Sequence, residues 1–225
     1  MYLPIHFEQT RPELLHELVR QHPLGLLITL ADAGLQANPI PFLLDAGTDG
    51  GPPVLRGHVA RANPVWREAR SDVPALVVFQ GPQAYVSPSF YPAKADHGKV
   101  VPTWNYVTVQ ARGTLRAIDD PNWVRGLVTR LTERHETPRV APWAVSDAPE
   151  DYIATMLRSI VGIEIVLTAL TGKWKVSQNR STADRNGVAE GLREQAARNG
   201  DSATAAMAGW VDGSTPQDSS PLTNW

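Results

Sequence analysis

The segment Gly57–Pro64, with the sequence GHVARANP, places a histidine, an arginine and an asparagine where a predicted strand runs into a predicted helix start. The free backbone amides at a helix N-terminus, with the Arg61 guanidinium and the Asn63 amide, would bind an anion. Gly57 has no side chain, so a ligand could approach the backbone closely there. The alternative is that Arg61 is a solvated residue at a strand end and that Asn63 and Pro64 only begin a helix.

A second cluster is Lys99–Tyr106, with the sequence KVVPTWNY, which combines a lysine with hydroxyl, indole and amide groups. Because alternate residues of a strand share a face, Thr103 and Asn105 lie on one face, and Trp104 and Tyr106 lie on the other. A core face would explain the aromatic pair without any function. A buried threonine and asparagine need hydrogen-bond partners, however, and a polar ligand would supply them.

A third cluster is Gly172–Arg180, with the sequence GKWKVSQNR, in which two lysines precede a run of polar side chains at a predicted strand end. Lys173 and Lys175 would point the same way and form a basic edge. The alternative is a sheet edge that charge protects against aggregation, which is common. The polar run Ser177–Asn179 holds more amides than such an edge needs.

Composition excludes several classes of protein. The chain contains none of the motifs GxSxG, HExxH, Walker A or GxGxxG. It has no cysteine, which excludes disulfides, cysteine-ligated zinc and thiol chemistry. Its 21 basic and 23 acidic residues give a net charge of −2, so it is not a strongly basic phosphate binder, although a local basic patch is allowed. Without a signal peptide or an apolar run of about 18 residues, we expect a cytoplasmic protein and no membrane partner.

Strands joined by turns are expected to position these clusters. The 225 residues include 19 prolines and 17 glycines, which is too many for a helical bundle. We expect strands at Leu24–Leu30, Leu35–Asp45, Val54–Ala60, Pro74–Gly81, Gln83–Tyr91, Lys99–Ile118, Val161–Leu170 and Lys173–Arg180, with turns at Gly81-Pro82 and Thr171-Gly172. Since Pro39 and Pro41 cannot donate to a ladder, their strand should lie at an edge, be bulged or face a ligand. The pattern predicts a closed or nearly closed antiparallel barrel.

Helices are expected to flank this barrel. They are predicted at Thr10–His22, Arg61–Ala69, from Pro121 after an Asp119 or Asp120 cap, at Asp151–Ile160, from Thr182 or Asp184 to Arg198, and after Asp201. Lys94–Gly98 is expected to be a polar loop. The helix that ends at Arg198 is polar all round, so we expect it to be exposed. The residues after the last helix, 212–225, have the composition of a disordered tail.

Six blocks of the sequence point to one family: MYLPIHF, HVARANPVW, FQGPQAYVSPSFY, VVPTWNY, IVGIEI and GKWKVSQNR. In this order they resemble the PaiB-type FMN-binding negative transcriptional regulators, from Met1 to about Leu192. The resemblance implies a flavin-reductase-like split β-barrel, related to pyridoxamine phosphate oxidase, that is mainly β with flanking helices (α+β). It implies an FMN-binding domain at residues 1–192 and a helical or disordered tail at 193–225. It also implies a homodimer that holds FMN in a groove at its interface.

The same resemblance assigns flavin contacts. HVARANP corresponds to the strand and turn that bind the flavin phosphate, so His58, Arg61 and Asn63 become the leading phosphate and ribityl contacts. Residues 38–41 would lie along the isoalloxazine, and the polar run from Ser177 would reach in from the partner chain. The complete set of predicted cofactor-binding residues is Asn38, Ile40, Pro41, His58, Val59, Ala60, Arg61, Asn63, Lys99, Thr103, Trp104, Asn105, Ser177, Gln178, Asn179 and Arg180.

Three functions are open at this point: a flavin-binding repressor, an FMN-dependent oxidoreductase that uses NAD(P)H on a small molecule, and a flavin or haem carrier. His58 is the nearby candidate for acid–base chemistry, and it could equally orient the phosphate. A small-molecule effector is a further expected partner. Without a helix-turn-helix signature, contact with DNA would depend on basic residues that a dimer displays twice, and solvated helix faces explain these equally well. They are Arg112, Arg116, Arg125, Arg130, Arg134, Arg139, Lys173, Lys175, Arg180 and Arg185.

Overall fold

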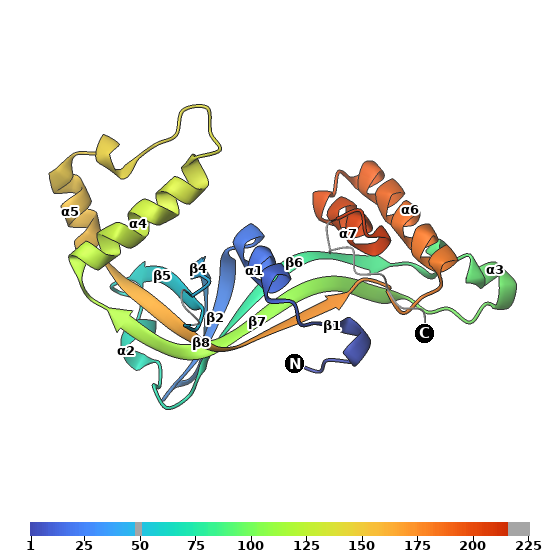
Figure 1. The fold of residues 1–225 in the computed structure, drawn as a ribbon, viewed down its shortest axis with the longest axis horizontal. Coiled ribbons are helices and arrows are strands. Elements are labelled where there is room, and N and C mark those ends of the chain that lie inside the picture. Colours follow the sequence, from blue (N-terminus) through green and yellow to red (C-terminus); the bar gives the residue numbers. More distant parts are fainter. Residues whose placement is uncertain (48–50, 216–225) are drawn as a thin grey trace. The chain divides into compact units, whose positions relative to one another are not determined.

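The computed structural model describes residues 1–47 and 51–215, which fall into two compact units (Figure 1). Unit 1 comprises Met1–Leu15, Gln80–Val109 and the chain from Thr171 onward, and unit 2 comprises His16–Phe79 and Gln110–Leu170. Three long strands contribute residues to both units. They are β6 (Ala75–Val86), β7 (Thr103–Ile118) and β8 (Ile160–Lys175).

Eight strands of the described residues form one sheet, in the order β3-β2-β6-β7-β8-β5-β4, with β1 paired to β8. The shorter strands are β1 (Glu8–Gln9), β2 (Leu24–Ala31), β3 (Gly34–Pro41), β4 (Leu43–Asp45) and β5 (Val54–Ala60). The pairs of β1 with β8, β2 with β3 and β6, and β5 with β4 and β8 are all antiparallel. The predicted fold class, an antiparallel split-barrel type with flanking helices, is confirmed.

Strand β3 ends the sheet order and forms a hairpin with β2. Pro39 stands opposite Leu26 and Pro41 stands opposite Leu24 in this hairpin. An edge strand leaves one row of its backbone groups outside the ladder, so two residues without an N–H are tolerated there. Of the three alternatives for the proline-containing strand, an edge, a bulge or a ligand-facing position, the structure shows the edge.

Helix α4 (Pro121–Glu136) of unit 2 contacts β5 and packs on β4. Unit 2 holds most of α1 (Pro12–Gln21), and all of α2 (Val65–Glu68), α4, the 3-10 turn η3 (Val145–Asp147) and α5 (Glu150–Arg158). Asp120 caps α4, as predicted, by accepting hydrogen bonds from the backbone N–H groups of Asn122 and Trp123. Leu127 and Leu131 of α4 pack against Leu43 of β4, and this contact fixes α4 beside β4 and β5.

Unit 1 contains η1 (Ile5–Phe7), η2 (Pro88–Phe90), α3 (Ala93–His97), α6 (Thr182–Asn199) and α7 (Ser202–Asp212). Figure 1 shows α6 and α7 side by side. A Cβ atom on Gly187 would lie 2.3 Å from the Phe90 carbonyl oxygen, and one on Gly191 would lie 2.3 Å from the Phe90 ring. The two glycines therefore let η2 pack directly on α6, so the prediction that this helix is exposed is wrong.

Two predicted turns are continuous strand instead. β6 passes through Gly81-Pro82, which is possible because the pairing of β6 with β2 ends at Val78. β8 passes through Thr171-Gly172, where a Cβ on Gly172 would lie 2.2 Å from Leu15, so this glycine serves packing and not a turn. The loop expected at Lys94–Gly98 is largely α3, whose C-terminal Gly98 adopts a left-handed conformation.

The predicted boundary between residues 192 and 193 falls within α6, and the division into an FMN-binding domain and a tail stays a prediction. The helix expected after Asp201 is present as α7. The disordered tail was predicted for residues 212–225; α7 includes Asp212, and residues 216–225 lie outside the described residues. Of the helices that the structure describes, none combines the length and the apolar character needed to cross a membrane.

Candidate functional site

The predicted flavin contacts form two groups, one in each unit. We call the unit 2 group the β5-end cluster; it consists of Asn38, Ile40, Pro41, His58, Val59, Ala60, Arg61 and Asn63. We call the unit 1 group the β8-end cluster; it consists of Lys99, Thr103, Trp104, Asn105, Ser177, Gln178, Asn179 and Arg180.

Arg61 in the β5-end cluster is tied to its own chain. Its guanidinium donates to both carboxylate oxygens of Asp119, at 2.8 and 2.6 Å, and to the carbonyl oxygens of Arg158 and Ile160, at 2.7 and 3.2 Å. The hydrogen bonds and charge of Arg61 hold the pKa of Asp119 below its ordinary value. Because a carboxylate already neutralises this cation, a phosphate at Arg61 would have to displace Asp119.

Asn63 joins two segments that the sequence analysis assigned to the same site. Its Nδ2 donates to Asn38 Oδ1 at 2.9 Å, and its Oδ1 accepts from the backbone N–H of Val65 at 3.0 Å. The structure thus brings Asn38 and Asn63 together. The adjoining helix α2 is only four residues long, and the space beside Gly57 is occupied, since a Cβ there would lie 3.1 Å from Ile40 and from the Pro41 carbonyl oxygen. Neither a long helix N-terminus nor open backbone is available for an anion here.

His58 lies on the wall of a cavity of about 280 Å³. Its Nδ1 is buried and has no hydrogen-bond partner among residues 1–47 and 51–215, and burial lowers its pKa. The cavity is lined by Pro41, His58, Leu131, Thr132, His135, Glu136 and Trp143. The residues of α4 that line this cavity were not predicted from the sequence, because His135 stands far from His58 in the chain. The arrangement places a histidine with a lowered pKa on the wall of a small cavity, with its Nδ1 buried.

The stability of the protein is expected to depend on pH through His58. Burial lowers the folded-state pKa of His58, so below about pH 6.5 the unfolded chain binds more protons than the folded chain. The associated stability is present above about pH 6.5 and is lost as the pH falls toward the lowered value. Urea unfolding at about pH 7.5 and 5.5 should show a smaller pH effect in His58→Gln than in the wild type. The exposed His97→Gln serves as the control, and an unchanged pH effect in His58→Gln would contradict the expectation.

The remaining residues of the β5-end cluster are either buried or exposed without a polar side-chain group. Ile40 and Val59 are 3% and 5% exposed, so neither side chain is available to a ligand. Pro41 and Ala60 are exposed. The role predicted for residues 38–41, to lie along the isoalloxazine, stays a prediction.

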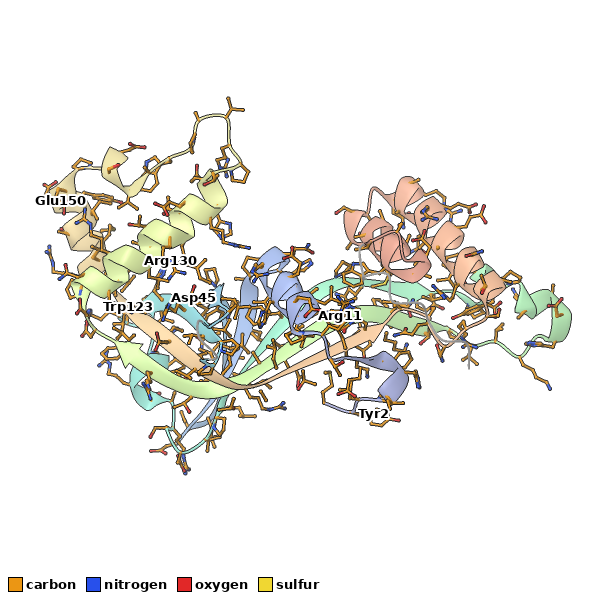
Figure 2. The ribbon with its side chains drawn as sticks, in the orientation of Figure 1. Tyr2, Arg11, Asp45, Trp123, Arg130 and Glu150 are labelled. Carbon is orange, nitrogen blue, oxygen red and sulfur yellow. The ribbon has the colours of Figure 1, made fainter. Side chains whose placement is uncertain are left out.

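Helix α4 is held to the sheet by an ion-pair network, seen in part in Figure 2. Arg56 donates to Glu164 at 2.9 Å and to Asp45, and Arg130 of α4 also pairs with Asp45. Two further arginines predicted as basic surface pair with carboxylates, and a third bonds a backbone carbonyl oxygen. Arg125 bonds Glu150, Arg139 bonds Glu136, and Arg134 donates to the Arg20 carbonyl oxygen. Carboxylates therefore offset much of the positive charge of this helix.

In the β8-end cluster, β7 and the segment after β8 are joined inside one chain. Asn105 Nδ2 donates to Ser177 Oγ at 2.9 Å, and these residues are only 1% and 4% exposed. Lys175 Nζ donates to Thr103 Oγ1 and to the Trp104 carbonyl oxygen, each at 2.5 Å. The polar face predicted for Thr103 and Asn105 is present, and its partners come from the same chain.

The other members of the β8-end cluster have different surroundings. Trp104 is 49% exposed and meets Tyr85 edge to face, so the alternative of a core face does not hold for Trp104. Gln178 closes the turn by accepting from the Val176 N–H and donating to the Trp174 carbonyl oxygen. The Arg180 guanidinium lies 5.0 Å from the centre of the Tyr91 ring. Lys99 and Asn179 are exposed.

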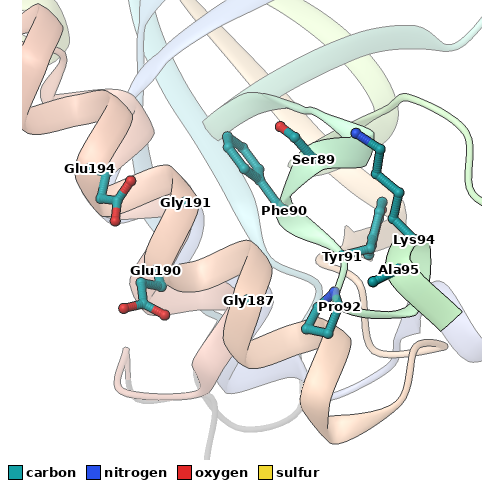
Figure 3. A pocket seen from close by; sticks show the side chains of 10 residues that line it. All are labelled: Ser89, Phe90, Tyr91, Pro92, Lys94, Ala95, Gly187, Glu190, Gly191 and Glu194. Carbon is teal, nitrogen blue, oxygen red and sulfur yellow. The ribbon is translucent and has the colours of Figure 1, made fainter.

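A larger cavity of about 560 Å³ lies between α6 and the η2–α3 segment of unit 1 (Figure 3). Figure 3 shows Glu190 and Glu194 on the α6 wall and Lys94 on the opposite wall. Two carboxylates against one lysine repel a phosphate dianion, so this cavity does not suit the flavin phosphate.

The donor sets of the two clusters fit FMN in chemical type. FMN carries a phosphate dianion, a hydroxylated ribityl chain and a planar ring with a polar edge. Lys175 and Arg180 supply positive charge, the Asn38–Asn63 pair supplies amides, and Trp104 supplies an exposed aromatic face.

Comparisons with known proteins give a family and a fold. A family model described as "Putative FMN-binding domain" matches residues 1–169. An uncharacterised protein of Aspergillus fumigatus is 36% identical, over 86% of this chain and 91% of its own length. "Protease synthase and sporulation protein PAI 2" of Bacillus subtilis is 30% identical, over 87% of this chain and 90% of its own. A conserved hypothetical protein of Mycobacterium tuberculosis has a similar fold, with a TM-score of 0.54 at 12% identity, over 78% of this chain and 91% of that one.

Proposed function

Because the chain belongs to this FMN-binding domain family, we propose that it is a PaiB-type negative transcriptional regulator, a homodimer with FMN at its interface. Family membership confirms the predicted cofactor and the PaiB-type resemblance; the dimer, the interface position and the regulatory role are what the proposal adds. The observation that carries it is the pair of ordered polar clusters in one FMN-binding chain. In a dimer each cluster occurs twice, so both chains can contribute to each flavin.

This chain's residues would bind and orient the flavin. FMN itself supplies electron and hydride transfer when bound. The amides of Asn38 and Asn63 and the backbone of Pro41 would contact its polar groups, and the exposed Trp104 ring would offer a surface for stacking. The neutral His58 imidazole would donate or accept a hydrogen bond at its free nitrogen.

The regulatory role is tested by an electrophoretic shift assay with promoter fragments. The proposal expects a shift that depends on the fragment's sequence and persists above about 100 mM salt, since specific binding outlasts bulk phosphate attraction. A shift that is indifferent to sequence and is already lost when the salt concentration is raised to about 100 mM would contradict it. Flavin-free protein in the same assay shows whether FMN is the signal.

An FMN-dependent oxidoreductase is the second candidate, and two observations favour it. Arg125 and Arg130 of α4, and Arg139 after it, are paired with carboxylates, which reduces the free positive charge for DNA, and His58 lines a cavity of unit 2. Stopped-flow mixing with NADH or NADPH separates the candidates. A regulator that only senses flavin needs no turnover, whereas rapid repeated flavin reduction would support the enzyme. A carrier would show neither a DNA shift nor turnover.

A further inference from the structure

Three cations gather where β8 ends: Lys173, Lys175 and Arg180, which we call the β8 cation cluster. Lys173 is only 7% exposed. Its ammonium donates to the Tyr2 carbonyl oxygen at 3.1 Å and lies 5.7 and 5.3 Å from the ring centres of Tyr2 and Tyr106. The buried end of this side chain is therefore surrounded by neutral groups.

The other two cations also have neutral partners. Lys175 bonds the Thr103 hydroxyl and the Trp104 carbonyl oxygen, and Arg180 lies over the Tyr91 ring. Across the described parts of the chain, 1–47 and 51–215, none of the three cations forms an ion pair with a carboxylate. Glu8 stands opposite Lys173 in the β1–β8 register without pairing with it.

This arrangement differs from the charge-protected sheet edge considered from sequence. At Lys173 the strand β8 is paired with β1, and β7 is its neighbour in the sheet order, so the lysine is not on an open edge. Burial lowers the pKa of Lys175, and the charges of Lys173 and Arg180 lower it further. Gathering like charges in a partly buried place is unfavourable unless an anion offsets them.

We propose that the β8 cation cluster binds the phosphate monoester of FMN, with Lys175 and the Thr103 hydroxyl as its central contacts. This inference rests on the proposed flavin-binding function. It moves the phosphate away from Arg61, whose charge Asp119 already neutralises, to cations that form no ion pair with a carboxylate of residues 1–47 and 51–215.

Comparing FMN with riboflavin tests this placement, because riboflavin has the same ring and ribityl chain without the phosphate. Affinities are measured on the full chain, freed of flavin, by the quenching of flavin fluorescence. Lys175→Gln should weaken FMN binding about 10- to 100-fold and riboflavin binding less than about threefold, since only a charge-assisted contact is lost. Lys175→Arg should retain most of the FMN affinity. Lys94→Gln, an exposed lysine of the same unit, is the matched control and should change neither.

The outcomes distinguish a failure of the phosphate placement from a failure of the proposed flavin-binding function. Equal effects of Lys175→Gln on both flavins, or no effect on FMN, overturn the phosphate placement. If the wild type binds neither flavin, the proposed function itself fails. Inorganic phosphate should compete with FMN and not with riboflavin. If instead phosphate raises the melting temperature of the wild type but not of Lys175→Gln, while FMN and riboflavin bind alike, the cluster serves another phosphate ligand and the FMN placement is overturned. Lys173→Met, checked for folding by circular dichroism, should repeat the FMN-selective loss.

Discussion

Gly113→Ala is expected to destabilise the protein by about 3 kcal/mol, because a Cβ at this position has no room. It would lie 2.2 Å from the carbonyl oxygen of Val166 and 2.8 Å from the carbonyl carbon. Gly113 is in β7 and Val166 is in β8, which are neighbours in the sheet order. The clash is with backbone and not with a flexible side chain, so it is relieved only when the strands shift.

Urea unfolding of the wild type and two variants measures this effect. Gly126→Ala is the matched control, since nothing lies within 4 Å of a Cβ there and the position is inside α4. This control should be stabilised by about 0.5 to 1 kcal/mol, because alanine is the better helix former. Similar unfolding midpoints for Gly113→Ala and the wild type would show that the two strands are not packed this closely.

Asn105→Leu is expected to destabilise the protein by about 2 kcal/mol, because it leaves the buried Ser177 hydroxyl without its donor. Asn105 and Ser177 are 1% and 4% exposed, and they bond each other at 2.9 Å. Ser177 also has a φ of 64°, a left-handed conformation that a residue other than glycine adopts only when its surroundings hold it. The bond to Asn105 therefore stabilises the turn that carries Gln178 and Arg180.

A double-mutant cycle with Ser177→Ala tests whether this bond is the cause. The double variant should be more stable than the sum of the two single effects predicts, by about 1 kcal/mol, because the second substitution removes the unsatisfied hydroxyl. Strictly additive effects would mean that the two residues act independently.

Local signals predicted much of the fold. Asp120 before Pro121 specified the start of α4, and Pro39 and Pro41 specified an edge strand. The errors arose where tertiary packing determined the outcome. Gly172 looked like a turn residue, and it is a glycine because Leu15 leaves no space for a side chain. A single sequence does not show which distant residue will occupy that space.

The same distinction holds for the candidate site. The sequence predicted polar roles for Asn63 and Asn105, and each forms a hydrogen bond with another predicted site residue. The ion pair between Arg61 and Asp119 could not be predicted from the sequence, because the two residues follow different strands and lie 58 positions apart. Charge balance at an arginine depends on such partners, so a motif alone does not show which cation is free to bind a ligand.

An absorbance spectrum of the purified full chain tests the central claim, that this protein binds FMN, most directly. We expect a flavin absorbance band at about 450 nm and the release, on denaturation, of about one FMN per chain. If the protein is colourless and also fails to bind added FMN, the claim that this chain binds FMN is contradicted.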